Sequence, residues 1–113
     1  MSQSFTSSIA DITIPSGTSV SRIVYAFSEY SDATAILLSG PATLDALTFT
    51  IETSMDNGLT FTTLNDGTAD IGPPAAVKSR QYIEMMGSSA FRIKASGNVA
   101  ADRAFKASKQ WTL

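Results

Sequence analysis

The chain has 113 residues and a formal net charge of −2, and it contains neither cysteine nor histidine. This length fits one domain, and the missing residue types exclude disulfides, thiolate zinc sites, Ser-His-Asp triads and imidazole general bases. No apolar run approaches the ~20 residues that span a bilayer, and the first ten residues resemble no secretory signal, so we expect cytoplasmic synthesis and no membrane partner.

The composition favours strands. Charged residues make up 16% of the chain, against about 25% in ordinary domains, while the hydroxyl residues are abundant, with 16 Ser and 13 Thr. Charge is also unevenly distributed. Residues 1–77 hold eight acids and one base, and residues 78–113 hold seven bases and two acids. We favour mutual neutralisation inside the fold; the alternative is a head-to-tail contact between subunits.

In chain order, the first eleven residues are polar except for Phe5 and Ile9. They are either a frayed tail or an extended arm that lies on a neighbouring subunit, with Phe5 as its anchor. We therefore expect an N-terminal arm over 1–11 and a β-sandwich domain over 12–113. Within these ranges, short alternating or apolar stretches predict strands at 9–15, 19–27, 34–40, 47–53, 60–64, 77–85, 90–96 and 102–113. Segment 34–40 also fits the start of a helix, but the Gly-Pro after it favours a strand.

The clearest local signal lies at 47–64. Leu47, Phe49 and Ile51 alternate with polar residues, and the pattern resumes at Leu59. Between the two runs, Asn57 and Gly58 tolerate the positive φ that hairpin turns require, so the segment predicts a hairpin.

About eight short strands separated by Gly, Pro, Asn or Asp predict a single all-β domain, an antiparallel β-sandwich or jelly roll. The periodicity leaves open whether the sandwich is a jelly roll or immunoglobulin-like. The residues expected to face inward are Ile14, Ile23, Tyr25, Phe27, Leu37, Phe49, Ile51, Phe61, Phe91, Ile93 and Phe105.

The sequence offers little chemistry. Residues 56–58 lack the further ligands of a calcium-binding loop, and the stretch 65–70 fits an Asx-type turn better than a metal site. The carboxylates Glu29, Asp32 and Glu52 fit a solvated surface better than a glycosidase pair. Basic residues near aromatics at 91–96 and 103–111 alternate as an exposed strand face does. We therefore expect no catalytic residue, metal, cofactor or nucleic-acid partner.

Several residues fit a contact surface instead. Trp111, two residues from the end, is either a core residue or an interface anchor, since Trp is enriched at interface hot spots. The candidate subunit contacts are Phe5, Ile9, Asp56, Asn57 and Trp111.

Three stretches carry a family resemblance: "LTFTIETSMDNGLTFTTL" (47–64), "GPPAAVKS" (72–79) and "SSAFRIKASGNVAADRAFKAS" (88–108). They resemble small β-sandwich virion proteins of tailed bacteriophages, which carry a Thr-Phe-x-x-Glu strand, an Asp-Gly-Gly turn, a Phe-Arg-Ile-Lys strand and an Ala-Asp-Arg-x-Phe strand. Here these are Leu47–Thr53, Asp56–Gly58, Phe91–Lys94 and Ala101–Phe105. No residue in the match is a metal ligand or catalytic group.

The resemblance implies a non-enzymatic cement or decoration protein on the capsid surface, forming a homotrimer and binding the major capsid protein. A neck or baseplate component is the alternative within this class. A carbohydrate-binding β-sandwich is the alternative outside it, with Tyr25, Tyr30, Tyr82 or Trp111 as stacking platforms.

Overall fold

The structure is a computed structural model that describes residues 4–25, 29, 35–84 and 88–112, with the side chains of 4–9 and 110–112 left aside. The predicted all-β architecture is confirmed, and each strand overlaps one expected from the sequence. Segment 34–40, for which a helix start was the alternative, contains a strand. The strands are β1 (Ser4–Ile14), β2 (Val24–Tyr25), β3 (Ala35–Ser39), β4 (Phe49–Ser54), β5 (Thr62–Thr63), β6 (Ser79–Tyr82), β7 (Ala90–Ala95) and β8 (Arg103–Thr112).

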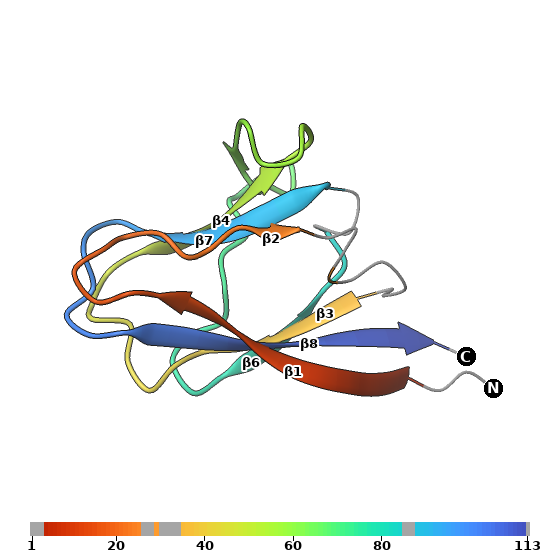
Figure 1. Cartoon of the computed structure of the whole chain (residues 1–113), viewed down its shortest axis with the longest axis horizontal. Coiled ribbons are helices and arrows are strands. Elements are labelled where there is room, and N and C mark those ends of the chain that lie inside the picture. The colour runs from red at the N-terminus through yellow and green to blue at the C-terminus, as the bar shows by residue number, and fades with distance from the viewer. Residues whose placement is uncertain (1–3, 26–28, 30–34, 85–87, 113) are drawn as a thin grey trace.

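Two four-stranded antiparallel sheets face each other (Figure 1), in the orders β1-β8-β3-β6 and β2-β7-β4-β5. The first strand pairs with the last, the second with the seventh, the third with the sixth and the fourth with the fifth. Only the β4–β5 connection stays within one sheet. This nested pairing is the strand order of a jelly roll. It distinguishes a jelly roll from an immunoglobulin-like sandwich, which the periodicity could not do.

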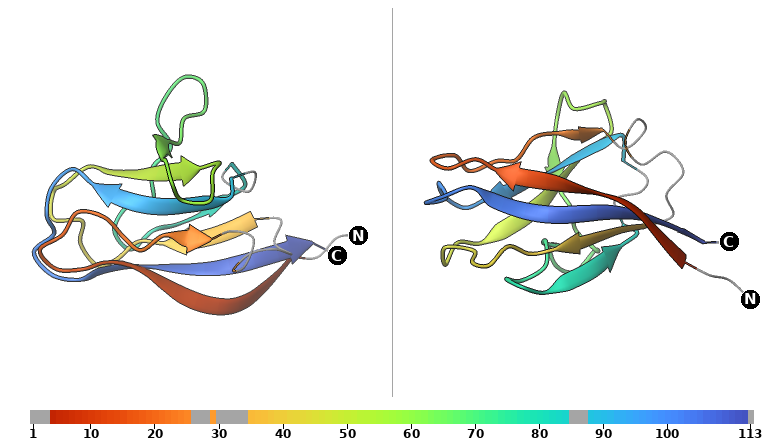
Figure 2. Two further views of the ribbon diagram at one scale, coloured as in Figure 1. Left: turned by 45° about the horizontal axis from the view of Figure 1, so that its top comes forward. Right: turned by 60° about the horizontal axis from the view of Figure 1, so that its bottom comes forward.

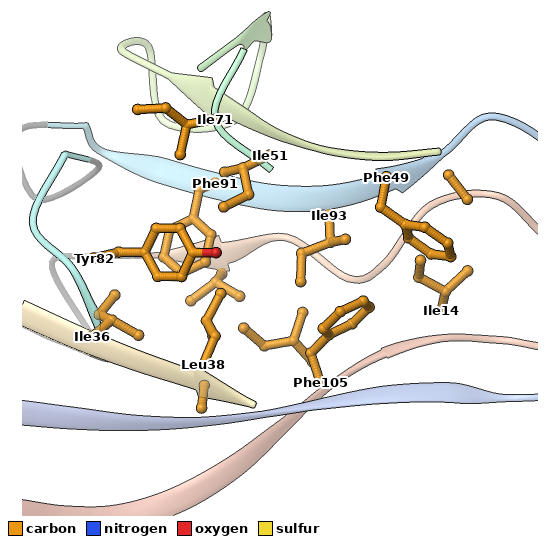
Figure 3. Packing of buried hydrophobic residues seen from close by; sticks show 14 of the residues in the cluster. Ile14, Ile36, Leu38, Phe49, Ile51, Ile71, Tyr82, Phe91, Ile93 and Phe105 are labelled. Carbon is orange, nitrogen blue, oxygen red and sulfur yellow. The ribbon is translucent and has the colours of Figure 1, made fainter. Parts of the chain in front are cut away.

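The core fills the space between the sheets (Figure 3). Ile51 and Ile93 are opposite each other in the β4–β7 ladder and are fully buried. Phe49 of β4 meets Phe105 of β8 edge to face across the sheets, with ring centroids 5.8 Å apart, the geometry that aromatic pairs favour. Burial of large apolar side chains from both sheets therefore holds the sandwich together.

Several inward assignments are wrong or only partly right. In β2 the buried side chain is Val24, while Tyr25, expected to face inward, is 39% exposed. Both faces of segment 19–27 carry large apolar residues, so alternation alone does not identify the inward face. Ile23, Leu37 and Phe61 are half-buried. Phe27 lies outside the described residues.

The longest pairing joins the two ends of the described chain. β1 runs antiparallel to β8 from Ser4↔Thr112 to Ile14↔Arg103, with a register shift between Thr6 and Ile9. The two strands form a ribbon that extends beyond the opposite sheet (Figures 1 and 2). The expected boundary between arm and domain, at 11/12, falls inside β1, and an arm role toward a neighbouring subunit stays a prediction.

Ion pairs between residues 1–77 and residues 78–113 support mutual neutralisation inside the fold as the explanation of the uneven charge. Of the five ion pairs that the described residues form, three join an acid before residue 78 to a base after it. The tightest is bidentate: Arg103 Nη2 lies 2.6 Å from Asp45 Oδ1, and Nε lies 2.9 Å from Oδ2. The Arg103 guanidinium also holds the pKa of Asp45 below its usual value. The other two pairs are Arg92–Glu52 and Lys106–Asp11.

Candidate contact surface

The loop between β4 and β5, which we call the tip loop (residues 54–61), is the best-defined surface feature. The flanking strands pair at Glu52↔Thr63 and Thr53↔Thr62, so the predicted hairpin is confirmed. Asn57 and Gly58 have the expected positive φ, 61° and 92°. The connection is longer than a tight turn, however, and Leu59, expected in the returning strand, lies in the loop.

Side chains give the tip loop its shape. Ser54 is buried, and its hydroxyl donates to Asp56 Oδ1 at 2.7 Å and accepts the Gly58 amide at 2.8 Å. Ser89, the residue before β7, has a hydroxyl that accepts the Asn57 amide at 2.9 Å and donates to the Ser54 carbonyl at 3.0 Å. The loop is therefore fixed to the sheet by bonds that satisfy its own backbone.

Asp56 completes this network. Its carboxylate accepts the Thr60 hydroxyl at 2.6 Å and the Thr60 amide at 2.8 Å, besides the Ser54 hydroxyl. Hydrogen bonds to the charged form stabilise it, and those from Thr60 and then Ser54 lower the pKa of Asp56 to about 2. Asp56 is thus ionised near neutral pH and organises the loop; its contact role stays a prediction.

The tip loop also displays apolar side chains. Met55 is 87% exposed and Leu59 is 84% exposed. Gly58 lies against Tyr25 of β2, since a Cβ at Gly58 would be 3.5 Å from the Tyr25 ring. Sequence reasoning selected the neighbouring Asp56 and missed Met55 and Leu59. The available signal was two large apolar residues within a turn, where strand alternation cannot bury them.

A second loop, the acidic turn (residues 65–70), follows β5 after Leu64. Asp66 Oδ1 accepts the amides of Thr68 and Ala69, both at 2.8 Å, and these bonds lower the pKa of Asp66. Asp70 accepts the side-chain amide of Asn65 at 2.9 Å. The geometry is that of the Asx-type turn predicted for this stretch. Over the described part of the chain, no group of three or more acidic residues is placed to hold a metal ion.

The other carboxylates considered for chemistry lie in ion pairs. Glu52 Oε1 is 2.7 Å from Arg92 Nε, and the Arg92 guanidinium lies over the ring of Phe61, 4.0 Å from its centroid. Glu29 is 2.9 Å from Arg22. Asp32 lies outside the described residues. Glu29 and Glu52 are therefore both ion-paired, and neither is a free carboxylate.

The aromatic residues proposed as sugar platforms do not form a common surface among the described side chains. Tyr82 was a wrong choice, because its ring is fully buried and its hydroxyl donates to the Gly72 carbonyl at 2.6 Å. Tyr25 remains exposed on β2. Tyr30 and the Trp111 side chain lie outside the described part of the structure.

The remaining predicted contacts lie on the β1–β8 ribbon. Phe5 and Trp111 are directly opposite each other in register, and Ile9 is opposite Ser108. The ladder therefore brings together two residues that are 106 positions apart in the sequence. β1 is the edge strand of its sheet, and exposed edge strands can pair with another chain; the contact roles of Phe5, Ile9 and Trp111 stay predictions.

Comparison with known proteins gives no family assignment. No family model matches the chain, and no curated protein and no solved structure matches it. Within the described residues, no helix has the length and apolar character needed to cross a membrane.

Proposed function

We propose that this chain is a non-enzymatic structural protein of a virion, and specifically a capsid decoration protein that binds neighbouring major capsid subunits. The strand order carries the proposal. Jelly rolls with this nested pairing recur in viral capsid domains, and also in lectins and cupins. Because a fold by itself hosts many functions, the surface and the resemblance to phage virion proteins must support the choice.

The surface supports a role in binding. Ten of the described charged side chains form ion pairs within the chain, and the described carboxylates form no metal cluster. Hydroxyl residues and a few apolar side chains make up much of what remains, which suits protein contacts more than charge-driven binding to phosphate. We include in the proposal a homotrimer, the virion surface as location, and the β1 edge as a subunit contact.

The experiment is binding to particles. Capsids prepared without this chain, from the virus whose genome encodes it, are mixed with the purified protein and sedimented, while light scattering gives the oligomeric state. Co-sedimentation in a saturable ratio to the major capsid protein, with a trimer in solution, is the expected result. A monomer that stays in the supernatant and is retained on a polysaccharide column would support the carbohydrate-binding alternative instead.

A further inference from the structure

The tip loop combines a fixed backbone with exposed apolar side chains. The side chains of Ser54 and Asp56 accept hydrogen bonds from four loop groups, three amides and one hydroxyl. Met55 and Leu59 are nevertheless each more than four-fifths exposed. A loop that is ordered before binding loses less conformational freedom when it is captured. Large apolar side chains held out from an ordered loop are therefore well suited to insertion into a partner.

The size of this patch indicates the shape of the partner. Met55, Leu59 and the exposed edge of Tyr25 offer apolar surface on the order of 300 Å², whereas a stable interface buries about 800 Å² per partner. The loop is too small to hold two copies of the chain together face to face. It fits a concave socket on a larger surface, where the two side chains act as anchors and the surrounding contacts exclude water.

Charge indicates the chemistry of the socket's rim. Residues 53–77 contain three acids, Asp56, Asp66 and Asp70, and no Lys or Arg. None of the three belongs to an ion pair with another described residue. Two bases reach this region from other strands: Arg92, which is paired with Glu52, and Arg80, which is paired with Glu84 and contributes to the lowered pKa of Asp66. The tip loop and the acidic turn both stand out from the β2-β7-β4-β5 sheet (Figure 1). A partner surface that approaches them is complementary if its rim is basic.

We propose that Met55 and Leu59 insert into an apolar socket with a basic rim on the partner protein, and that Asp66 and Asp70 face this rim. The inference rests on the proposed function, which makes the partner the capsid surface. It deepens that proposal because it assigns capsid binding to the tip loop and leaves the β1–β8 ribbon for contacts between copies.

The test measures binding of the intact chain to capsids prepared without it, by co-sedimentation over a range of protein concentrations. The double variant Met55→Ser/Leu59→Ser is expected to bind at least about 10-fold more weakly than wild type. Ile83→Ser is the matched control, since Ile83 is 65% exposed directly after β6 of the opposite sheet, and the affinity of this variant should be unchanged. Urea unfolding of each variant establishes that the fold is retained.

A second variant tests the rim. Asp66→Asn/Asp70→Asn keeps an oxygen acceptor for the internal bonds of the acidic turn but removes two charges. We expect weaker capsid binding at low salt and a flatter decline of affinity with added salt. An unchanged salt dependence would contradict the basic rim.

The outcomes separate the two proposals. If wild type fails to bind capsids, the proposed function fails. If wild type binds and Met55→Ser/Leu59→Ser binds equally well, only the tip-loop inference is wrong. A wild-type oligomer that the double variant converts to monomer would assign the loop to a second copy, and flotation of wild type with phosphatidylcholine vesicles would assign it to lipid; either result overturns the capsid socket.

Discussion

Replacing Ser54 with alanine should loosen the tip loop and weaken the whole fold. The hydroxyl is 1% exposed, accepts the Gly58 amide at 2.8 Å and donates to Asp56 at 2.7 Å. A net hydrogen bond contributes about 0.5–1.5 kcal/mol. Both of these bonds are lost, together with a longer third one that the hydroxyl accepts from the Asp56 amide at 3.3 Å, but the half-buried Gly58 amide and the exposed Asp56 regain water. The expected loss in the free energy of unfolding is therefore about 1–2 kcal/mol.

Equilibrium unfolding in urea measures this loss, which should appear as a lower midpoint at an unchanged m-value. Amide hydrogen exchange should be faster at Gly58 and Thr60, because local opening no longer breaks the bonds from Ser54. Ser79→Ala is the matched control, since Ser79 is exposed on β6 and its substitution should change stability by less than about 0.5 kcal/mol. If Ser54→Ala behaves like Ser79→Ala in both measurements, side-chain bonds do not fix the loop.

Three further predictions concern other positions. Tyr82→Phe leaves the Gly72 carbonyl without its donor and should lower the free energy of unfolding by about 1–2 kcal/mol in urea titrations; a change within error would mean that water replaces the hydroxyl. Val77→Gly should raise the free energy of unfolding by about 0.5–1 kcal/mol, because exposed Val77 has φ 52° and the strain that glycine relieves exceeds the conformational entropy that it adds to the unfolded chain. Val77→Ala keeps a side chain at positive φ and should raise the free energy of unfolding less. Since the pKa of Asp56 is depressed, its contribution to loop order is present above the unfolded-state pKa near 3.9 and is lost as pH falls through about 2. An NMR titration of the Thr60 amide should show this midpoint, and Thr60→Val should move it upward; a wild-type midpoint near 4 would contradict the network.

The strands were predictable because each short apolar or alternating stretch ends at Gly, Pro, Asn or Asp. The inward face of β2 was not. Val24 and Tyr25 are both large and apolar enough to fill a core, and only pairing of β2 with β7, Val24↔Phe91 and Tyr25↔Ala90, determines which one points inward. Strand order was equally inaccessible, since the first and last strands pair across nearly the whole chain and local periodicity carries no information on such partners.

The tip loop was also only partly predictable from the sequence. Positive φ at Asn57 and Gly58 followed from residue type alone. The length of the loop did not follow from residue type, because it depends on hydrogen bonds from the Ser54 and Asp56 side chains to backbone groups four residues away. The spacing Ser-x-Asp-x-Gly-x-Thr at 54–60 is a usable signal for such a loop in other sequences.

The central claim is that the chain is a structural protein of the capsid surface. Electron microscopy of purified virions, at a resolution that distinguishes two packed sheets, tests it most directly. The claim predicts jelly-roll density at symmetry-related positions on the outer capsid, with the tip loop directed at the major capsid protein. Particles whose shell lacks such density, or that carry the chain only in the neck or baseplate, would contradict it.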